Sequence, residues 1–316
     1  MIMPIPLGAR VASGFDAVGL GLNTIDILAV VKEFPSSNGK YPLQELVELP
    51  GGQAASALVA CSRLGWRACY IGSFGNDARG MEARSGLIGD GVNVSACRFV
   101  NAPQPLSLIL VDGNHQRTVL WSRSPQLDLE PGDVKEMNIR AGRILLVDCY
   151  ETRAAIQAAE FARKAGVPTV IDVDEARPGL ASLLERIDIM ITDEAFPELF
   201  SGVSGVGSAL ERMMKEFRPA VACATLGRQG SLTLVNGTEI FTPAFDVAVV
   251  DSTGAGDAFR GGFMAGWLQA GTSPRVEDVL LYASAVAALQ TRGLGARTAM
   301  PSREEVDSFF RDRKPL

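Results

Sequence analysis

The stretch that decides the fold is DSTGAGDAFRGGF, residues 251–263. Gly254 and Gly256 flank one small residue, so the backbone here is free to adopt positive φ and to approach a ligand closely. After this turn, aromatic residues recur at intervals of four, at Phe259, Phe263 and Trp267. That spacing predicts a helix whose first amides lack intrahelical partners and whose positive dipole end favours anions. The stretch therefore predicts an anion site at the start of a helix.

Asp257 stands at the rim of this predicted site. A carboxylate at a helix N-terminus is favoured in its charged form, so it is suited to accept a proton from a hydroxyl. In phosphoryl transfer the protein contributes mainly positioning and charge stabilisation, and one carboxylate takes the proton of the attacking hydroxyl. A bare G-x-G-D is equally typical of a capped helix after a tight turn. The choice between the two interpretations therefore depends on the longer stretch.

Over its whole length the stretch resembles the C-terminal signature of the ribokinase-like (PfkB-type) carbohydrate kinases, D-T-x-G-A-G-D-x-F-x-x-G, with Ser252 and Arg260 at permissive positions. The resemblance implies that Asp257 is the catalytic base toward the acceptor hydroxyl. It also implies that the turn from Gly254 to Asp257 holds the transferred phosphoryl group, with the amides of Ala255, Gly256 and Asp257 as its anion hole. The resemblance extends from about residue 15 to residue 302.

Length and composition agree with an enzyme of this kind. The chain has 316 residues and a net charge of -6, and its Arg and Lys residues are scattered, which argues against a nucleic-acid surface. Its N-terminus lacks a signal-like segment, and no apolar run approaches the length of a membrane span, so we expect a soluble cytoplasmic protein with no membrane contact. The five cysteines are odd in number and widely spaced, which predicts reduced core residues.

The single histidine, His115, lies in the polar turn DGNHQ. One loop histidine leaves a serine or cysteine nucleophile without a credible activating partner, and it also excludes histidine-based zinc sites. We expect a structural or solvent-facing side chain.

Continuous apolar segments alternate with helical segments along the chain. The predicted strands cover 18–31, 67–75, 143–148, 168–174, 187–192 and 220–227, and the predicted helices include 53–64, 78–89, 152–165 and 207–217. Buried strands that alternate with helices indicate a parallel sheet covered on both faces. The predicted fold is therefore α/β, a doubly wound and mostly parallel sheet with helices on both faces, and this is also the ribokinase-like fold.

Two segments, 32–49 and 97–122, interrupt this alternation. The second contains SLILV, the turn DGNH and RTVLW, which predicts a β-hairpin. The resemblance implies a small β lid over the sugar site built from these two segments, and a homodimer contact through that lid. With no linker or internal repeat, we expect residues 1–316 to form a single ribokinase-like kinase domain.

A second glycine turn precedes the predicted helix 53–64. Gly51 and Gly52 again allow close approach of the backbone to a ligand, although a plain strand-to-helix turn has the same appearance. The stretch GGQAAS resembles the N-terminal family signature G-G-x-x-x-N-x-A, which implies that Gly51, Gly52 and Gln53 contact the sugar. Ser56 stands where the family often has asparagine.

Asp26 is expected near the carboxyl end of the first predicted strand. Ligands of open α/β sheets bind outside these strand ends, where an acidic residue is able to accept from two adjacent sugar hydroxyls. The resemblance places Asp26 at the position of the family's substrate-binding aspartate.

The nucleotide side is predicted nearer the C-terminus. TLGRQGS, 225–231, resembles the family turn T-x-G-x-x-G, with nucleotide contacts implied for Thr225, Gly227 and Gly230. No Walker A motif is present.

Metal sites are predicted with ATP as the phosphoryl donor. Magnesium is expected because it neutralises charge on the nucleotide phosphates. Many family members carry N-x-x-E after a core strand, and this chain has DEAF, 193–196, so Asp193 is the candidate for a water-mediated magnesium contact. The family is able to use potassium near the glycine turn, where Asp251 is the candidate.

The resulting prediction is a cytoplasmic, ATP-dependent kinase that phosphorylates a carbohydrate hydroxyl. A nucleoside kinase on the same scaffold is the enzymatic alternative, and it would need an aromatic clamp from Phe34, Tyr41, Phe99 or Trp121. A catalytically silent sugar-binding or regulatory protein is the alternative from another class.

Overall fold

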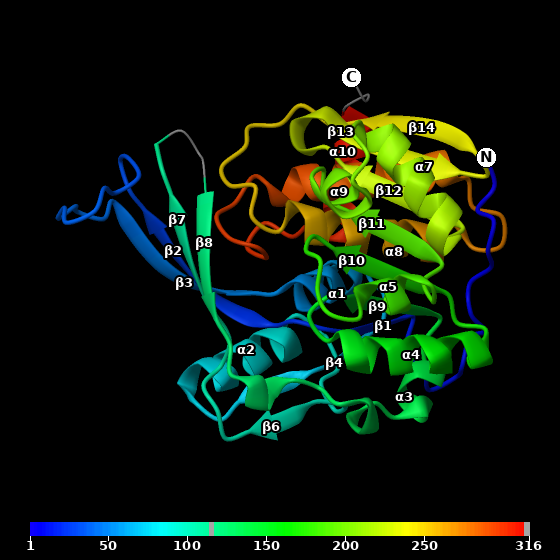
Figure 1. The fold of residues 1–316 in the computed structure, drawn as a ribbon, viewed down its shortest axis with the longest axis horizontal. Helices are drawn as coiled ribbons and strands as arrows, with labels where there is room; N and C mark the ends of the chain where they lie inside the picture. Colours follow the sequence, from blue (N-terminus) through cyan, green and yellow to red (C-terminus); the bar gives the residue numbers. More distant parts are fainter. Residues whose placement is uncertain (114–116, 313–316) are drawn as a thin grey trace.

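An eight-stranded sheet forms the centre of the computed structural model, which describes residues 1–113 and 117–312 (Figure 1). Its strand order is β14-β13-β12-β11-β10-β9-β1-β4. The parallel strands are β1 (Ala17–Leu20), β4 (Ala68–Ile71), β9 (Ile144–Asp148), β10 (Thr169–Val173), β11 (Ile189–Thr192) and β12 (Val221–Thr225). The strands β13 (Gly230–Val235) and β14 (Thr238–Pro243) continue the sheet in antiparallel pairing.

Helices cover both faces of this large sheet. Side chains alternate along a strand, so Leu146 of β9 joins one buried apolar cluster while Leu145 and Val147 join the other. The first cluster contains residues of α1 (Gln53–Arg63), α2 (Ala78–Gly89), α8 (Ala255–Ala270), α9 (Val276–Gln290) and α10 (Arg303–Asp312). The second contains residues of α3 (Glu136–Arg140), α4 (Thr152–Ala165), α5 (Leu180–Leu184), α6 (Phe196–Ser201) and α7 (Val206–Phe217). The predicted doubly wound α/β fold is confirmed.

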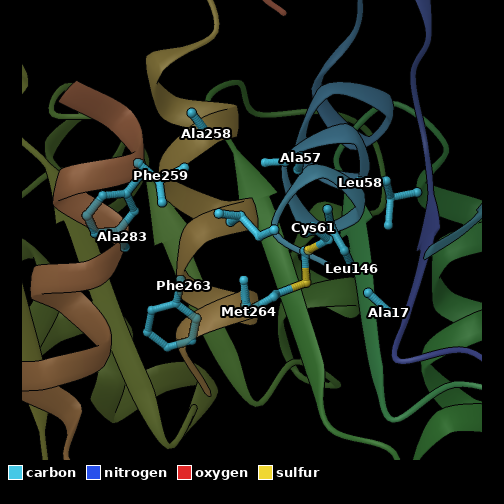
Figure 2. Packing of buried hydrophobic residues seen from close by; sticks show 14 of the residues in the cluster. Ala17, Ala57, Leu58, Cys61, Leu146, Ala258, Phe259, Phe263, Met264 and Ala283 are labelled. Carbon is cyan, nitrogen blue, oxygen red and sulfur yellow. The ribbon is translucent and has the colours of Figure 1, made fainter. Parts of the chain in front are cut away.

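Close packing of α1 against α8 fixes the helix that follows the glycine turn. Figure 2 shows Cys61 and Ala57 of α1 facing Met264 of α8 over the sheet. Gly261 makes the approach possible, because a Cβ on it would lie 2.5 Å from the carbonyl oxygen of Ala57. The Sγ of Cys61 donates to the carbonyl oxygen of Gly261 at 3.4 Å. The two helices are therefore held in one position relative to each other.

A four-stranded sheet, here called the small sheet, stands away from the main body in Figure 1. Its strand order is β3-β2-β7-β8, from β2 (Thr24–Val30), β3 (Glu45–Gly51), β7 (Leu106–Val111) and β8 (Arg117–Ser122). The strands β7 and β8 pair antiparallel, as predicted for the hairpin, and His115 lies outside the described residues. The short strands β5 (Ser73–Gly75) and β6 (Arg98–Val100) form a separate pair.

Two predicted strands are wrong in extent. The segment 18–31 is divided between β1 of the large sheet and β2 of the small sheet, and the segment 67–75 is divided between β4 and β5. Asp26 therefore lies inside a strand of the small sheet, not at the end of a core strand. In both segments the apolar sequence continues while the chain leaves the large sheet, so the pattern alone did not show the change.

The five cysteines are free, and four of them are buried, as predicted. Within the described part of the chain, none of the helices combines the length and apolar character that crossing a membrane requires.

Candidate functional site

A cleft of about 510 Å³ opens at the carboxyl ends of the parallel strands and is closed on one side by residues of the small sheet. Predicted site residues that line it are Asp26, Gly52, Gln53, Asp193, Thr225, Gly227, Gly254, Ala255, Gly256 and Asp257. Gly51, Gly230 and Asp251 do not line the cleft. The structure thus brings most of the predicted positions, from five separate parts of the chain, to one place.

The turn before α8 is held in a conformation that suits only glycine at its centre. Gly254 is the N-cap of α8 and has φ of 75°, and a Cβ on it would lie 2.6 Å from the Cα of Ala296. Asp251 braces the turn, since its Oδ1 accepts from the amide and hydroxyl of Thr253 at 2.9 and 2.8 Å and its Oδ2 accepts from the amide of Gly295 at 2.8 Å. Both oxygens of Asp251 are therefore already used inside the protein.

Two amides of this turn are available to an anion. The amide of Ala255 donates to the carbonyl oxygen of Ser252 at 3.2 Å, whereas those of Gly256 and Asp257 have no hydrogen-bond partner within the described residues. Free amides at a helix N-terminus, aided by the helix dipole, form an anion-binding site. The sequence prediction assigned three amides to this role, and the geometry leaves two of them free.

Asp257 lines the floor of the cleft, partly shielded from solvent. Burial raises the pKa of this carboxyl group to about 6, while the nearby guanidinium groups of Arg260 and Arg297 oppose the rise and the carboxylates of Asp174 and Asp26 add to it. With this pKa the group is mostly ionised at neutral pH and is still basic enough to take a proton.

Asp26 enters the cleft from the small sheet. Its side chain is buried and its Oδ1 accepts from the hydroxyl of Thr24 at 2.8 Å. Burial raises the pKa of Asp26, and hydrogen bonds from Thr24 and Ser107 oppose the rise. Its Oδ2 lies against the Cα of Gly51, where any Cβ would collide with it. Gly51 thus contributes by leaving room for Asp26.

The serine at position 56, where the family often has asparagine, is explained by an arginine that the sequence analysis missed. Arg297 is buried, its Nε donates to the Oγ of Ser56 at 3.0 Å, and its Nη2 donates to the carbonyl oxygen of Gly51. Its Nη1 has no partner in the described part of the chain. Burial lowers the pKa of Arg297 to about 10, and Asp26 is the first of the carboxylates that counteract this. Arg297 therefore remains charged and holds the glycine turn before α1.

Gln53 is tied to a carboxylate that the sequence analysis also missed. Its Nε2 donates to Oδ2 of Asp174 at 2.7 Å, while its Oε1 is buried without a partner among the described residues. Asp174 and Asp172 both line the cleft. Their position at the end of the predicted strand 168–174 was the available signal, because ligands bind outside these strand ends.

The predicted nucleotide turn lies at the end of β12. Thr225 donates through its hydroxyl to the carbonyl oxygen of Thr192 at 3.1 Å, and Gly227 begins a short 3-10 helix with φ of 54°. Gly230 has φ of 117° and starts β13, where it pairs with Pro243. Thr225 and Gly227 border the cleft, whereas Gly230 shapes the turn.

The described residues contain no group of three or more histidine, cysteine or acidic side chains that could hold a metal ion by themselves. Asp193 and Glu194 line the cleft, and the Oδ1 of Asp193 accepts from the amide of Phe196 at 2.8 Å. Burial raises the pKa of Asp193. A single carboxylate at the cleft fits a magnesium ion that keeps most of its waters and binds through nucleotide phosphates.

Comparison with known proteins identifies the family. The model of the pfkB family carbohydrate kinases matches residues 16–303. The chain belongs to this family. An ATP-dependent ribose-1-phosphate kinase from Halopiger xanaduensis is 30% identical over 292 residues, which cover 91% of this chain and 95% of that protein. A fructokinase from Klebsiella pneumoniae is 29% identical over 301 residues, which cover 88% of this chain and 95% of that protein.

The fold of this pfkB-family kinase also matches a solved structure. A ribokinase from Giardia lamblia superposes with a TM-score of 0.85 at 19% identity and covers 95% of this chain and 99% of that one. The family resemblance seen in DSTGAGDAFRGGF is confirmed, and the chain is a phosphotransferase that acts on a hydroxyl group.

Proposed function

We propose that this pfkB-family kinase transfers the γ-phosphoryl group of ATP to a hydroxyl of a small carbohydrate, with Asp257 as the base. The observation that carries the proposal is the position of Asp257. It stands beside the free amides of the α8 turn and in the same cleft as Asp26 and Gln53. A base that lies next to an anion site and faces a second polar subsite is the arrangement that phosphoryl transfer to a hydroxyl needs.

In this proposal the acceptor hydroxyl gives its proton to the Asp257 carboxylate as its oxygen attacks the γ-phosphorus. The amides of Gly256 and Asp257 then face the charge on the transferred group. Preorganised amides of this kind stabilise charge that develops in the transition state without any reorganisation. The helix dipole of α8 acts in the same direction.

The sugar is held on the other side by Asp26, with Gly52 and Gln53 around it, while Gly51 leaves room for the Asp26 side chain. The Asp26 carboxylate accepts hydrogen bonds from two sugar hydroxyls, and Arg297 keeps the Gly51 carbonyl and the turn in place. This binding orients one hydroxyl toward Asp257. Positioning of this kind supplies a large part of the rate in such reactions.

ATP is expected along Thr225 and Gly227, in the turn that Gly230 shapes. Magnesium bound to the nucleotide would neutralise phosphate charge, and Asp193 is the residue that would hold it. A potassium ion beside Asp251 would share the carboxylate with the turn, because both oxygens of Asp251 already accept hydrogen bonds. The cytoplasmic location stays a prediction.

We also propose that residues 1–316 act as one kinase domain, with the small sheet as the lid and as a homodimer contact. Alternation along the strands places Leu46 and Leu120 on the face opposite Asp26, and both are 56% exposed. An exposed apolar sheet face favours burial against a second copy. Light scattering of Leu46→Glu/Leu120→Glu tests this, with a monomer expected and an unchanged dimer as the contrary result.

The test of the function is an ADP-release assay with magnesium over ketoses, aldoses, sugar phosphates and nucleosides, repeated with Asp257→Asn. We expect turnover with a carbohydrate and its loss in the variant. Turnover with nucleosides alone would reassign the acceptor, and binding without turnover would favour a silent sugar-binding protein. None of the four clamp candidates, Phe34, Tyr41, Phe99 and Trp121, lines the cleft, which favours the carbohydrate.

A further inference from the structure

Arg260 occupies the catalytic end of α8, although its position in the family signature is permissive. It lies one helical turn after Asp257, its side chain is 4% exposed, and it lines the floor of the cleft. Its Nη2 forms an ion pair with Oδ1 of Asp172 at 2.7 Å and donates to the carbonyl oxygen of Ile191 at 3.1 Å. The guanidinium group is therefore fixed in one orientation by two strands of the large sheet.

The other arm of the same guanidinium reaches the anion-binding turn. A Cβ on Gly256 would lie 2.5 Å from Nη1 of Arg260, so the positive charge is packed directly against this residue. Gly256 carries one of the two free amides. A side chain at position 256 would displace the guanidinium, which gives this glycine a purpose beyond backbone freedom.

The surroundings of Arg260 are strongly acidic. Asp172, Asp174, Asp193 and Glu194 line the cleft together with Asp257. Burial raises the pKa of Asp257, and Arg260 is the largest influence that opposes it, followed by Arg297, while Asp174 and Asp26 act with burial. Without Arg260 the turn that receives an anion would face this group of carboxylates with one guanidinium group fewer, while Arg297 and Arg117 remain.

A purely structural ion pair is the competing explanation. Buried ion pairs often contribute little net stability compared with apolar residues of the same volume, because two charges have to leave water. A pair of this kind placed at the floor of a cleft therefore points to a use of its charge. The contact of Arg260 with Gly256 identifies the group on which the charge acts.

We propose that Arg260, anchored by Asp172, is a positioning residue that supplies fixed positive charge to both the Gly256 amide site and the Asp257 carboxylate. The inference rests on the proposed kinase function and extends it to a residue at a permissive position of the family signature. Fixed charge in a site that excludes water acts more strongly than in solution and needs no reorganisation during the reaction.

The test compares Arg260→Lys, Arg260→Gln and the neutral double variant Asp172→Asn/Arg260→Gln. The double variant leaves no unpaired charge, so it is expected to fold, as judged by circular dichroism and thermal unfolding. We expect its kcat to fall on the order of 10²-fold, as for loss of one stabilising donor, with little change in the acceptor KM. The acid limb of its kcat/KM profile should move to higher pH, and Arg260→Lys should recover part of both effects.

A matched control is Asp16→Asn/Arg143→Gln, which removes another ion pair, 3.5 Å long, near the amino ends of β1 and β9. Loss of stability without any change in kcat or in the acid limb is expected there. If Asp172→Asn/Arg260→Gln keeps the wild-type kcat and acid limb, the pair is structural and the inference is wrong.

Binding of ADP with magnesium and aluminium fluoride, measured by calorimetry, separates this inference from the proposed function. The double variant should bind this phosphoryl analogue at least tenfold more weakly and bind ADP alone as wild type does. A wild type that binds the analogue but phosphorylates no acceptor would overturn the proposed function while the Arg260 inference is judged by binding. Equal binding of the analogue by the double variant and wild type would overturn the inference.

Discussion

The large sheet and the small sheet place the same kind of side chain in opposite environments. Leu146 of β9 is fully buried, whereas Leu120 of β8 is 56% exposed. Both faces of the large sheet are covered by helices, while β8 is exposed along its whole length. Rigidity should therefore be concentrated in the large sheet, and the small sheet is the part able to move or to bind another molecule.

The cleft draws on both regions, and each contributes different chemistry. The base candidate and the anion-binding amides belong to the α8 turn, which is packed on the large sheet, while Asp26 comes from the small sheet. The groups that need fixed geometry are on the rigid part. In the proposed mechanism, the group that recognises the acceptor is therefore on the small sheet, which we propose acts as a lid.

The largest expected effect separates the two cleft carboxylates. Asp257→Asn should lower kcat by about 10²- to 10⁴-fold, because general base catalysis is lost. Asp26→Asn should instead raise the acceptor KM by about 10- to 100-fold, because hydrogen bonds to a charged group contribute roughly 1.5–3 kcal/mol. Steady-state kinetics with the acceptor identified in the screen measure both.

Glu211→Gln on the outer surface of α7 is the control for this pair, since Glu211 is half exposed and forms an ion pair with Lys215 of its own helix. No change in either constant is expected. A fall of kcat in Asp26→Asn as large as in Asp257→Asn would contradict the division between the two sheets.

The second prediction concerns stability and uses one matched substitution in each sheet. Leu146→Ala should lower the free energy of unfolding by about 2–5 kcal/mol, because it leaves a cavity in the core. Leu120→Ala should change it by less than about 0.5 kcal/mol in the monomer, as expected for an exposed side chain. Urea denaturation at low protein concentration gives both values. Equal costs at the two positions would show that the small sheet is covered in solution.

The division of the chain between two sheets also explains how much of the fold could be predicted from the sequence. The helices 53–64, 78–89, 152–165 and 207–217 agree with the structure to within a residue at each end, because helix periodicity and caps are local signals. The segment 18–31 was wrong because its apolar run passes from one sheet to the other. The change occurs around Asn23, whose Nδ2 donates to Tyr70 and to the carbonyl oxygen of Ser73, contacts that no local pattern encodes.

In the site, too, the residues of local motifs could be predicted and the residues that depend on distant partners could not. The glycine turns and Asp257 belong to short motifs, and the structure places them in or beside one cleft. The roles of Arg260 and Arg297 could not be predicted, because each depends on partners distant in sequence. Arg297 meets Ser56 across 241 positions and Arg260 meets Ile191 across 69. The replacement of asparagine by Ser56 was visible, but the arginine that fills the space was not.

The third prediction concerns pH. Asp257 has a folded pKa of about 6, raised mainly by burial, and a base acts only when ionised. The kcat/KM for the acceptor should therefore be constant at neutral pH and fall about tenfold per unit below pH 6. The free energy of unfolding should change with pH in the opposite direction, because a pKa that is raised in the folded state means that the native protein favours the protonated carboxyl. The contribution of Asp257 to stability is present below pH 3.8 and is lost as the pH rises through about 6.

Asp257→Asn tests the predicted pH dependence of both activity and stability. The variant should remove that loss of stability between pH 4 and 6, measured by urea denaturation at each pH. A wild-type acid limb well below pH 5 would show that the Asp257 carboxyl is not desolvated in solution. In that case the large-sheet side of the cleft would be wetter than its packing indicates.

The smallest expected effect lies at the contact between the two regions. Arg79 of α2 and Glu48 of β3 form a two-pronged ion pair, with Nη2 to Oε1 at 2.7 Å and Nε to Oε2 at 3.0 Å, and both side chains are about 40% exposed. A double-mutant cycle with Arg79→Gln and Glu48→Gln should give a coupling energy of about 0.2–1 kcal/mol that declines with added salt, because exposed pairs are screened by water and ions. The acceptor KM should not change, since neither residue lines the cleft.

A salt-independent coupling of several kcal/mol, or an acceptor KM that changes when Arg79 or Glu48 is replaced, would mean that this contact fixes the small sheet against α2. The small sheet would then be as rigid as the large one, and closure over the acceptor would have to come from the side chains of β8 instead.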